Sequence, residues 1–114
     1  MSGVYIFLGG GVGAFIRYLF SLLISYLSLP LWVATLAVNS IGSILLVVSY
    51  DLIISLQLEK QLLIKVGFLG GLTTFSTMSF EIIELIKKGS FLEAFLVFGL
   101  NILFGIGIGV FLSR

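Results

Sequence analysis

Apolar residues run along this chain in four long stretches, separated by short polar or turn-forming segments. The stretches cover about residues 4–26, 31–56, 62–86 and 91–112. Each is long enough to cross the hydrocarbon core of a bilayer, which takes about 20 helical residues. No segment is left over for a soluble domain. The pattern therefore predicts a single four-helix transmembrane domain over residues 1–114, in a cell membrane.

The third stretch carries an unusual interruption, the run G-G-L-T-T-F-S-T-M-S from Gly70 to Ser79. A row of hydroxyl groups is costly on a helix that faces lipid, because each hydroxyl needs a hydrogen-bond partner there. Discontinuous membrane helices recur at ion and substrate sites, where the freed backbone groups become ligands. The run predicts that the third helix is broken in mid-span and that the break lies at an ion site.

The segment Lys87-Lys88-Gly89-Ser90 separates the third stretch from the fourth. Glycine is the commonest residue just past the end of a helix, and serine is a favoured N-cap. We expect Gly89 to end the third helix and the Ser90 side chain to cap the fourth.

Composition supports a membrane protein and excludes several other classes. The chain is 60% hydrophobic and 10% charged, with a mean hydropathy of +1.30, well outside the range of soluble domains. A net charge of +1 without a basic cluster argues against a nucleic-acid partner. The absence of Cys and His excludes disulfides, thiol chemistry and the commonest transition-metal ligands.

The acidic residues give no sign of catalysis. They lie toward the ends of the stretches, where we expect solvated charge, and are Asp51, Glu59, Glu81, Glu84 and Glu93. No carboxylate pair lies in the middle of a stretch, and no nucleophile has a plausible base beside it. The sequence therefore does not predict an enzyme.

The basic residues are almost evenly divided between the two sides of the membrane. Lys60, Lys65 and Arg114 fall on one side of a four-helix topology, and Lys87 and Lys88 on the other. The positive-inside rule needs a clear excess to set an orientation. Either one residue of bias decides, or chains insert both ways and pair antiparallel. Charge alone leaves these two alternatives open.

Glycines spaced four residues apart occur in three of the four stretches. The pairs are Gly9 with Gly13, Gly67 with Gly71, and Gly105 with Gly109. Such pairs let helix backbones approach closely in a membrane. For any one pair, packing inside a single chain is the simpler interpretation. Three pairs together suggest more contact surface than four helices would use, which favours a dimer.

Arg17 lies deep in the first stretch. A central arginine costs roughly 2.5–3.5 kcal/mol on insertion scales, so it should be paired or face water, unless it lies nearer the bilayer edge and snorkels to the interface. We favour a structural or electrostatic role over direct ion binding, because no acidic residue lies in mid-span to pair with it. A permanent cation near a pathway would favour anions.

Asn39 is the one amide in the middle of the second stretch, and it belongs to a polar stripe. Thr35, Asn39, Gly42 and Ser43 recur at helical spacing and so share one face. Their N–H and O–H donors could bind an anion stripped of water. A hydrogen bond that merely joins two helices is the alternative. Asn101 repeats the situation in the fourth stretch.

Phe75 interrupts the hydroxyl row of the third stretch. The edge of an aromatic ring carries partial positive charge and can contact an anion without trapping it as a full charge would. Most of the 11 phenylalanines should face lipid or the core, and only its position inside the T-T-F-S-T run singles out Phe75.

Several of these residues match one known pattern. They are Gly13, Ala14, Arg17 and Tyr18 after the first glycine-rich run, Asn39 with Gly42, and the segment Gly67–Thr77. On these residues the chain resembles the Fluc (CrcB) family of fluoride channels, and the resemblance covers all four stretches. It implies passive fluoride export through two pores in an antiparallel, dual-topology homodimer.

The resemblance also implies roles for individual residues. A structural sodium ion at the dimer centre would be held by the backbone carbonyls of Gly70 and Thr73. The fluoride pore would be lined by Asn39, Phe75, Met78, Ser76, Thr77, Ser79 and Asn101, with Arg17 near its entrance. Met78 replaces the second of two fluoride-contacting phenylalanines, and Val97 stands where family members often carry tyrosine. Both departures alter the expected fluoride coordination.

Two other functions remain as alternatives. A small multidrug exporter also has four helices, but it needs a membrane-embedded carboxylate, and the first stretch holds Arg17 and no glutamate. A non-transporting assembly subunit would use every polar residue to join helices. A flux assay separates the three.

Overall fold

The structure, a computed structural model, describes residues 2–113 and is entirely helical in its ordered elements over that range. In chain order the elements are α1 (Ser2–Tyr26), α2 (Trp32–Ile54), α3 (Leu58–Gln61), η1 (Leu62–Leu69), α4 (Gly70–Leu72), α5 (Phe75–Lys87), α6 (Phe91–Ile102), η2 (Leu103–Gly107) and α7 (Ile108–Leu112). The segments η1 and η2 are π-helical.

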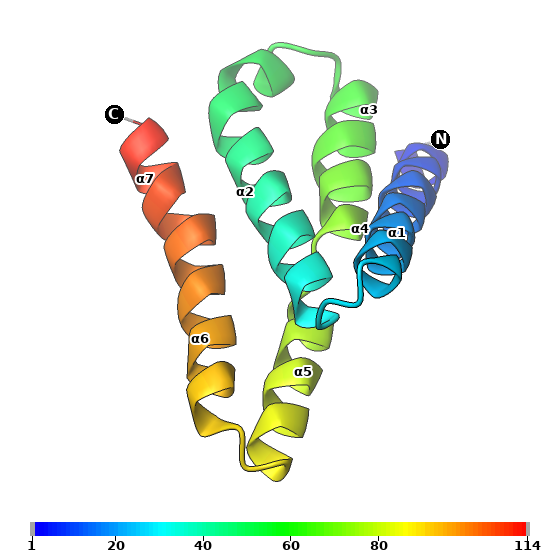
Figure 1. Cartoon of the computed structure of the whole chain (residues 1–114). Helices are drawn as coiled ribbons and strands as arrows, with labels where there is room; N and C mark the ends of the chain where they lie inside the picture. The colour runs from blue at the N-terminus through cyan, green and yellow to red at the C-terminus, as the bar shows by residue number, and fades with distance from the viewer. Residues whose placement is uncertain (1, 114) are drawn as a thin grey trace.

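These elements form four membrane spans. Helices α1 and α2 are one span each, α3 to α5 form the third over Leu58–Lys87, and α6 to α7 form the fourth over Phe91–Leu112. All four are long and apolar enough to cross a membrane, which confirms the predicted four-helix, multi-pass architecture. The start of α1, the α2–α3 turn and the end of α7 lie at one end, and the α5–α6 turn lies at the other (Figure 1).

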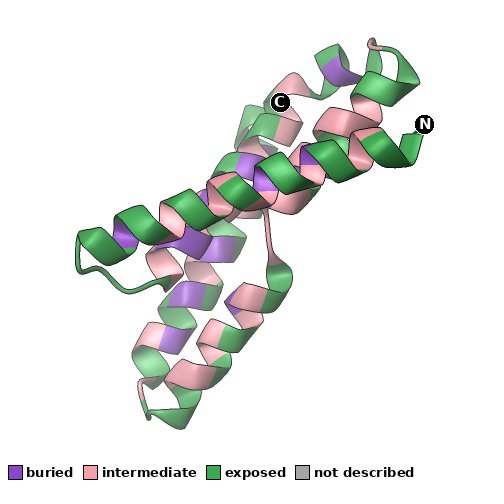
Figure 2. Ribbon diagram, turned by 90° about the vertical axis from the view of Figure 1, so that its right-hand side faces the viewer, coloured by how far each residue is buried: buried purple, intermediate pink, exposed green. Residues whose placement is uncertain are grey.

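Only a thin interior is closed off within one chain. Val38 of α2 and Val97 of α6 are fully buried, at 0% exposure, where these two helices approach the third span. In the most apolar window of each span, only 11–22% of the residues are buried. Figure 2 shows the buried positions on inner helix faces and exposed residues around the outside. Apolar side chains therefore point outward, as a bilayer requires.

Helix α1 packs against the third span through interlocking glycines. A Cβ added at Gly9 would collide with the carbonyl oxygen of Leu63, and one at Gly13 with that of Phe68. From the other side, a Cβ at Gly67 would come within 3.0 Å of the Gly9 Cα. The absent side chains let the two backbones touch, which is how small residues join membrane helices.

The third glycine pair is also used inside the chain. A Cβ at Gly105 would lie 3.7 Å from the Ser43 hydroxyl, and one at Gly109 would lie 3.4 Å from Val47. Both glycines therefore face α2. All three glycine pairs make contacts within one protomer, so they do not favour a dimer over packing inside a single chain, and the dimer stays a prediction.

The predicted break in the third helix is confirmed and lies at Thr73 and Thr74. Both residues have extended backbones, with ψ of 154° and 123°, between helices α4 and α5. Upstream, the eight residues of η1 are wound as a π-helix, a rare geometry that is frequent at functional sites. The span is thus irregular on one side of the break and interrupted at it.

The turn between the third and fourth spans follows one prediction and contradicts another. Gly89 ends α5 with φ of +79°, and the amides of Gly89 and Ser90 bond to Ile86 and Leu85 in a Schellman arrangement. The predicted cap by the Ser90 side chain was wrong. Its hydroxyl makes no capping bond, because ψ of 63° turns the residue away from N-cap geometry.

Candidate ion site at the helix break

The side chain of Asn39 holds the broken backbone from α2. Its Oδ1 accepts a hydrogen bond from the Thr74 amide at 2.7 Å, and its Nδ2 donates to the Thr74 carbonyl at 3.0 Å. An interrupted helix leaves such backbone groups without partners, which is costly in a membrane. One asparagine therefore satisfies both polar backbone groups of Thr74, and it fixes the position of the break relative to α2.

Asn39 also connects the break to the fourth span. Its Nδ2 donates to Asn101 Oδ1 at 3.1 Å, and Asn101 Nδ2 donates to the carbonyl of Val97 in its own helix at 2.8 Å. Asn101 is buried, at 8% exposure. Both N–H donors of Asn39 are therefore occupied in this conformation. The side chain predicted to line a pore is also the one that joins the second, third and fourth spans.

The break releases the carbonyls of Gly70 and Thr73. In a continuous helix the Thr74 amide would bond to Gly70 O, but here it bonds to Asn39. The Thr77 amide would bond to Thr73 O, but it bonds to Thr74 Oγ1 at 3.2 Å instead. The two carbonyls between them lose their helical donors in the same way. Freed carbonyls of this kind are the ligands that sodium takes in broken membrane helices.

The carbonyl oxygens of Gly70 and Thr73 are of the donor type that would suit the sodium ion implied by the family resemblance. Among the described residues, no group of three or more carboxylate, imidazole or thiol side chains could hold a metal. Main-chain oxygen is therefore the donor type available at the break, and it suits a hard monovalent cation.

Arg17 joins α1 to the same region. Its Nε donates to the carbonyl oxygen of Gly71 at 3.2 Å, near the C-terminal end of α4. A cation is favoured there because helix carbonyls point toward it. The contact is compatible with a structural role for Arg17, and it gives the half-buried guanidinium a partner although its span has no acidic residue.

A cavity of about 290 Å³ opens at the break between α2, α5 and the fourth span. Its polar wall comes from Asn39, Ser43, Thr73, Thr74 and Asn101, and its apolar wall from Phe75, Met78, Phe98, Ile102, Gly105 and Ile106. Met78 is buried at 6% exposure, whereas the Phe75 ring is 77% exposed at the rim. Polar side chains and an aromatic ring thus meet in one space.

Four of the predicted pore residues line this cavity: Asn39, Phe75, Met78 and Asn101. Arg17, Ser76, Thr77 and Ser79 are not among its lining residues. The hydroxyls of Ser76 and Thr77 gather instead around Thr74 Oγ1, at 3.4 and 3.2 Å. They form a small cluster at the start of α5 and extend the polar surface away from the cavity.

Sequence reasoning missed a polar pair beside this site. Thr35 Oγ1 of α2 donates to Glu81 Oε2 of α5 at 2.9 Å, and Glu81 Oε1 is buried without a partner. The expectation that the acidic residues are solvated was wrong for Glu81. The contact between α2 and α5 covers it. The one signal in the sequence is helical spacing, which puts Glu81 on the same helix face as the buried Met78.

Glu93 also departs from that expectation. Its Oε2 accepts a hydrogen bond from Trp32 Nε1 at 2.8 Å, which ties the start of α2 to the start of α6. Tryptophan is enriched at membrane interfaces, where its ring is apolar and its N–H finds a partner. The pair closes the bundle at the end opposite the α2–α3 turn.

Replacing Thr74 with alanine should loosen the start of α5. The change removes the hydroxyl that accepts from the Thr77 amide, and loss of such a cap costs about 1 kcal/mol. We expect a lower unfolding temperature in detergent for Thr74→Ala and an unchanged one for Thr74→Ser, which keeps the hydroxyl. Equal stability of the two variants would show that the cap contributes nothing.

The amino-acid sequence matches known proteins over most of its length. The family described as "CrcB-like protein, Camphor Resistance (CrcB)" matches residues 4–113. A protein of Pyrococcus furiosus named "Fluoride-specific ion channel FluC" is 42% identical over 116 residues, covering 96% of this chain and 93% of the relative. A protein of the same name from Shewanella woodyi is 43% identical, over 87% of this chain and 82% of its own length.

Proposed function

The chain belongs to the CrcB-like family, and from this premise we propose that it is a fluoride-selective ion channel that lets fluoride leave the cell passively. The relatives cited above carry the name of a fluoride-specific channel, and the identity extends over most of both chains. A channel of this family is not an enzyme. The observation that carries the proposal furthest is the cavity at the helix break, where Asn39, Asn101 and Phe75 converge.

Fluoride is small, strongly hydrated and a strong hydrogen-bond acceptor, so a pore must replace its water with donors. Asn39 can do so by exchanging one acceptor for another. Its bond to Asn101 Oδ1 joins two neutral side chains, whereas a bond to fluoride is assisted by the anion's charge and is roughly twice as strong. Its bonds to Thr74 keep the amide in place during this exchange.

Phe75 and Met78 would complete the coordination from the apolar wall. An aromatic edge attracts an anion weakly, which allows it to leave again. Met78 offers a polarizable thioether where the family pattern has a second ring, so we expect one aromatic contact per chain here. The hydroxyls of Ser76, Thr77 and Ser79 and the charge of Arg17 would act along the approach to the cavity.

We further propose that two chains pair antiparallel around one sodium ion and form two pores. The carbonyls of Gly70 and Thr73 that the break frees would supply two ligands, and a second copy would add two more. A second copy would also cover the Phe75 ring, which a single chain leaves 77% exposed. The near balance of basic residues between the two membrane sides is compatible with insertion in both directions.

A flux measurement tests the function directly. Liposomes containing the purified protein and loaded with potassium fluoride should release fluoride rapidly after a potassium ionophore is added, and liposomes loaded with potassium chloride should retain chloride. Chloride is larger and a weaker acceptor, so the same donors compensate its dehydration less. Similar release of both anions, or of neither, would contradict a fluoride-selective channel.

The half-buried Glu81 gives little support to the alternative function, a proton-coupled exporter of cationic compounds. That carboxylate lies in α5, whereas the exporter class was expected to need one in the first helix, where Arg17 stands. The family match and the cavity lined by donors both favour an anion. Retention of fluoride together with proton-driven uptake of a quaternary ammonium dye would favour the exporter.

A further inference from the structure

Lys65 carries a charge inside a membrane span and forms no ion pair. It lies in η1, about two helical turns past the start of the third span. Among the described residues, the one ion pair within 4.0 Å joins Lys87 to Glu84 at 3.7 Å, and it does not involve Lys65. Because a charge in the membrane must be paired or hydrated, the surroundings of Lys65 need an explanation.

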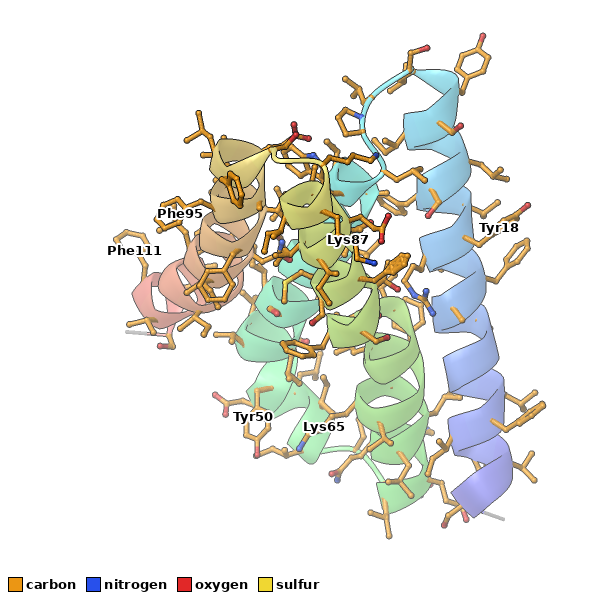
Figure 3. The ribbon with its side chains drawn as sticks, turned by 90° about the horizontal axis from the view of Figure 1, so that it is seen from below. Tyr18, Tyr50, Lys65, Lys87, Phe95 and Phe111 are labelled. Carbon is orange, nitrogen blue, oxygen red and sulfur yellow. The ribbon has the colours of Figure 1, made fainter. Side chains whose placement is uncertain are left out.

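The ammonium group of Lys65 is held against an aromatic face. Its Nζ lies 5.2 Å from the centroid of the Tyr50 ring of α2, and the two side chains meet at the same edge of the molecule (Figure 3). A cation over a ring keeps its hydrogen-bond donors for other partners. The contact therefore fixes the position of the charge without neutralising it.

Lys65 also lines a cavity that leads toward the helix break. This cavity has a volume of about 160 Å³, and Ser43, Thr73 and the proposed sodium ligand Gly70 are among its lining residues. Ser43 and Thr73 also line the 290 Å³ cavity at the break. The two spaces therefore adjoin along Ser43 and Thr73, with Lys65 at the end nearer the α2–α3 turn and Asn39 at the other.

A lysine in this position could simply extend its charge to the membrane surface. The shared lining residues favour a further role for the charge, because they put it where the proposed path would meet the membrane–water interface. One positive charge beside a narrow, low-dielectric path raises the local concentration of small anions. Because the ammonium group lies against Tyr50, it would attract an anion without binding that anion too tightly for it to move on.

We propose that Lys65, with the space lined by Ser43 and Thr73, is an anion-recruiting site at the α3 end of the pathway. The ligand of this site is a small hydrated anion, and the proposal rests on the proposed fluoride function. The site sets how efficiently the pathway fills at low fluoride concentration. Neighbouring charges at this end, Glu59 and Lys60 of α3 and Asp51 of α2, lie outside the cavity lining and contribute a general background.

Lys65→Gln tests the charge and keeps a polar side chain of similar reach. At about 10 mM ionic strength, we expect fluoride efflux from a low fluoride load to fall about threefold relative to the unmodified protein. At about 1 M salt, where the screening length is about 3 Å, the difference should nearly vanish. The matched control is Lys87→Gln, a side chain that is 69% exposed and outside both cavities, which should leave efflux unchanged.

A second test varies the charge within a single variant. The chain has no cysteine, so Lys65→Cys introduces its one thiol. Coupling 2-aminoethyl methanethiosulfonate restores a positive charge and should recover efflux, whereas coupling the 2-sulfonatoethyl reagent adds a negative charge and should lower it further. Lys87→Cys treated in the same way is the control, and it should respond to neither reagent.

The outcomes separate this site from the function it serves. If the unmodified protein passes fluoride but Lys65→Cys conducts equally with either reagent attached, the recruiting site is wrong and the channel stands. If the unmodified protein passes no fluoride, both proposals fail together. A salt-dependent loss in Lys65→Gln, reversed by the cationic reagent in Lys65→Cys, supports the recruiting site.

Discussion

Changing Asn39 to aspartate should reduce fluoride efflux at least a hundredfold. The substitution replaces two N–H donors with a carboxylate oxygen, which then faces the Thr74 carbonyl and Asn101 Oδ1 without a proton between them. It also sets a negative charge beside the proposed anion path. Two unit charges about 4 Å apart repel by about 4 kcal/mol at an effective dielectric constant of 20, which alone exceeds a hundredfold change.

The measurement is fluoride efflux from liposomes, made on protein that elutes as a single peak in detergent. Ser49→Asp is a matched control, because it adds the same charge to α2 about 15 Å along the helix from Asn39. It should leave efflux within about twofold, since at that distance surface charges are largely screened. Near-normal efflux in well-folded Asn39→Asp would remove Asn39 from the pathway.

Asn101→Leu separates the two roles of Asn39. It removes the acceptor at 3.1 Å but leaves both bonds between Asn39 and Thr74. The break should therefore keep its position, and efflux should change less than in Asn39→Asp. If the two variants lose efflux equally, the network between α2 and α6 matters more than the amide beside the anion.

Adding one methyl group at Gly13 should prevent stable folding. The Cβ of Gly13→Ala would collide with the Phe68 carbonyl oxygen and lie 2.7 Å from the Leu72 amide nitrogen, and backbone atoms cannot move aside as a side chain can. Overpacking costs about 1–3 kcal/mol and sometimes more. We expect an unfolding temperature in detergent at least about 10 °C lower, or no recoverable folded protein.

Gly11→Ala is the control for that prediction. It lies two residues away on the same helix, and a Cβ there meets no heavy atom within 4 Å. Alanine also favours the helix over glycine by up to about 1 kcal/mol, so stability should be unchanged or slightly higher. Similar stability of Gly13→Ala and Gly11→Ala would show that α1 does not pack on the third span through Gly13.

Part of this molecule could be predicted from local patterns. Hydropathy needs only a window of neighbouring residues, so the four spans and the break near Thr73 and Thr74 were predictable. Helical spacing likewise placed Thr35, Asn39 and Ser43 on one face. Glycine at position 89 was readable as a helix end, because few other residues adopt its positive φ.

The partners of those residues could not be predicted in this way. Asn39 bonds to Thr74 and Asn101, which lie 35 and 62 positions away, and Arg17 bonds to Gly71 at a separation of 54. Such contacts depend on where helices cross, and a periodic pattern does not encode the crossing points. The burial of Glu81 was missed for the same reason, since only the approach of α2 covers it.

The amino-acid sequence by itself determined that this chain crosses a membrane four times, that its third crossing is interrupted, and which polar groups are available there. These properties follow from transfer free energies and backbone preferences, which act over a few residues. The tertiary structure alone decided that α1 docks through Gly9 and Gly13, that one asparagine holds the break, and that Lys65 lies against the Tyr50 ring. Those outcomes depend on close packing between distant segments, where a single methyl group changes the result.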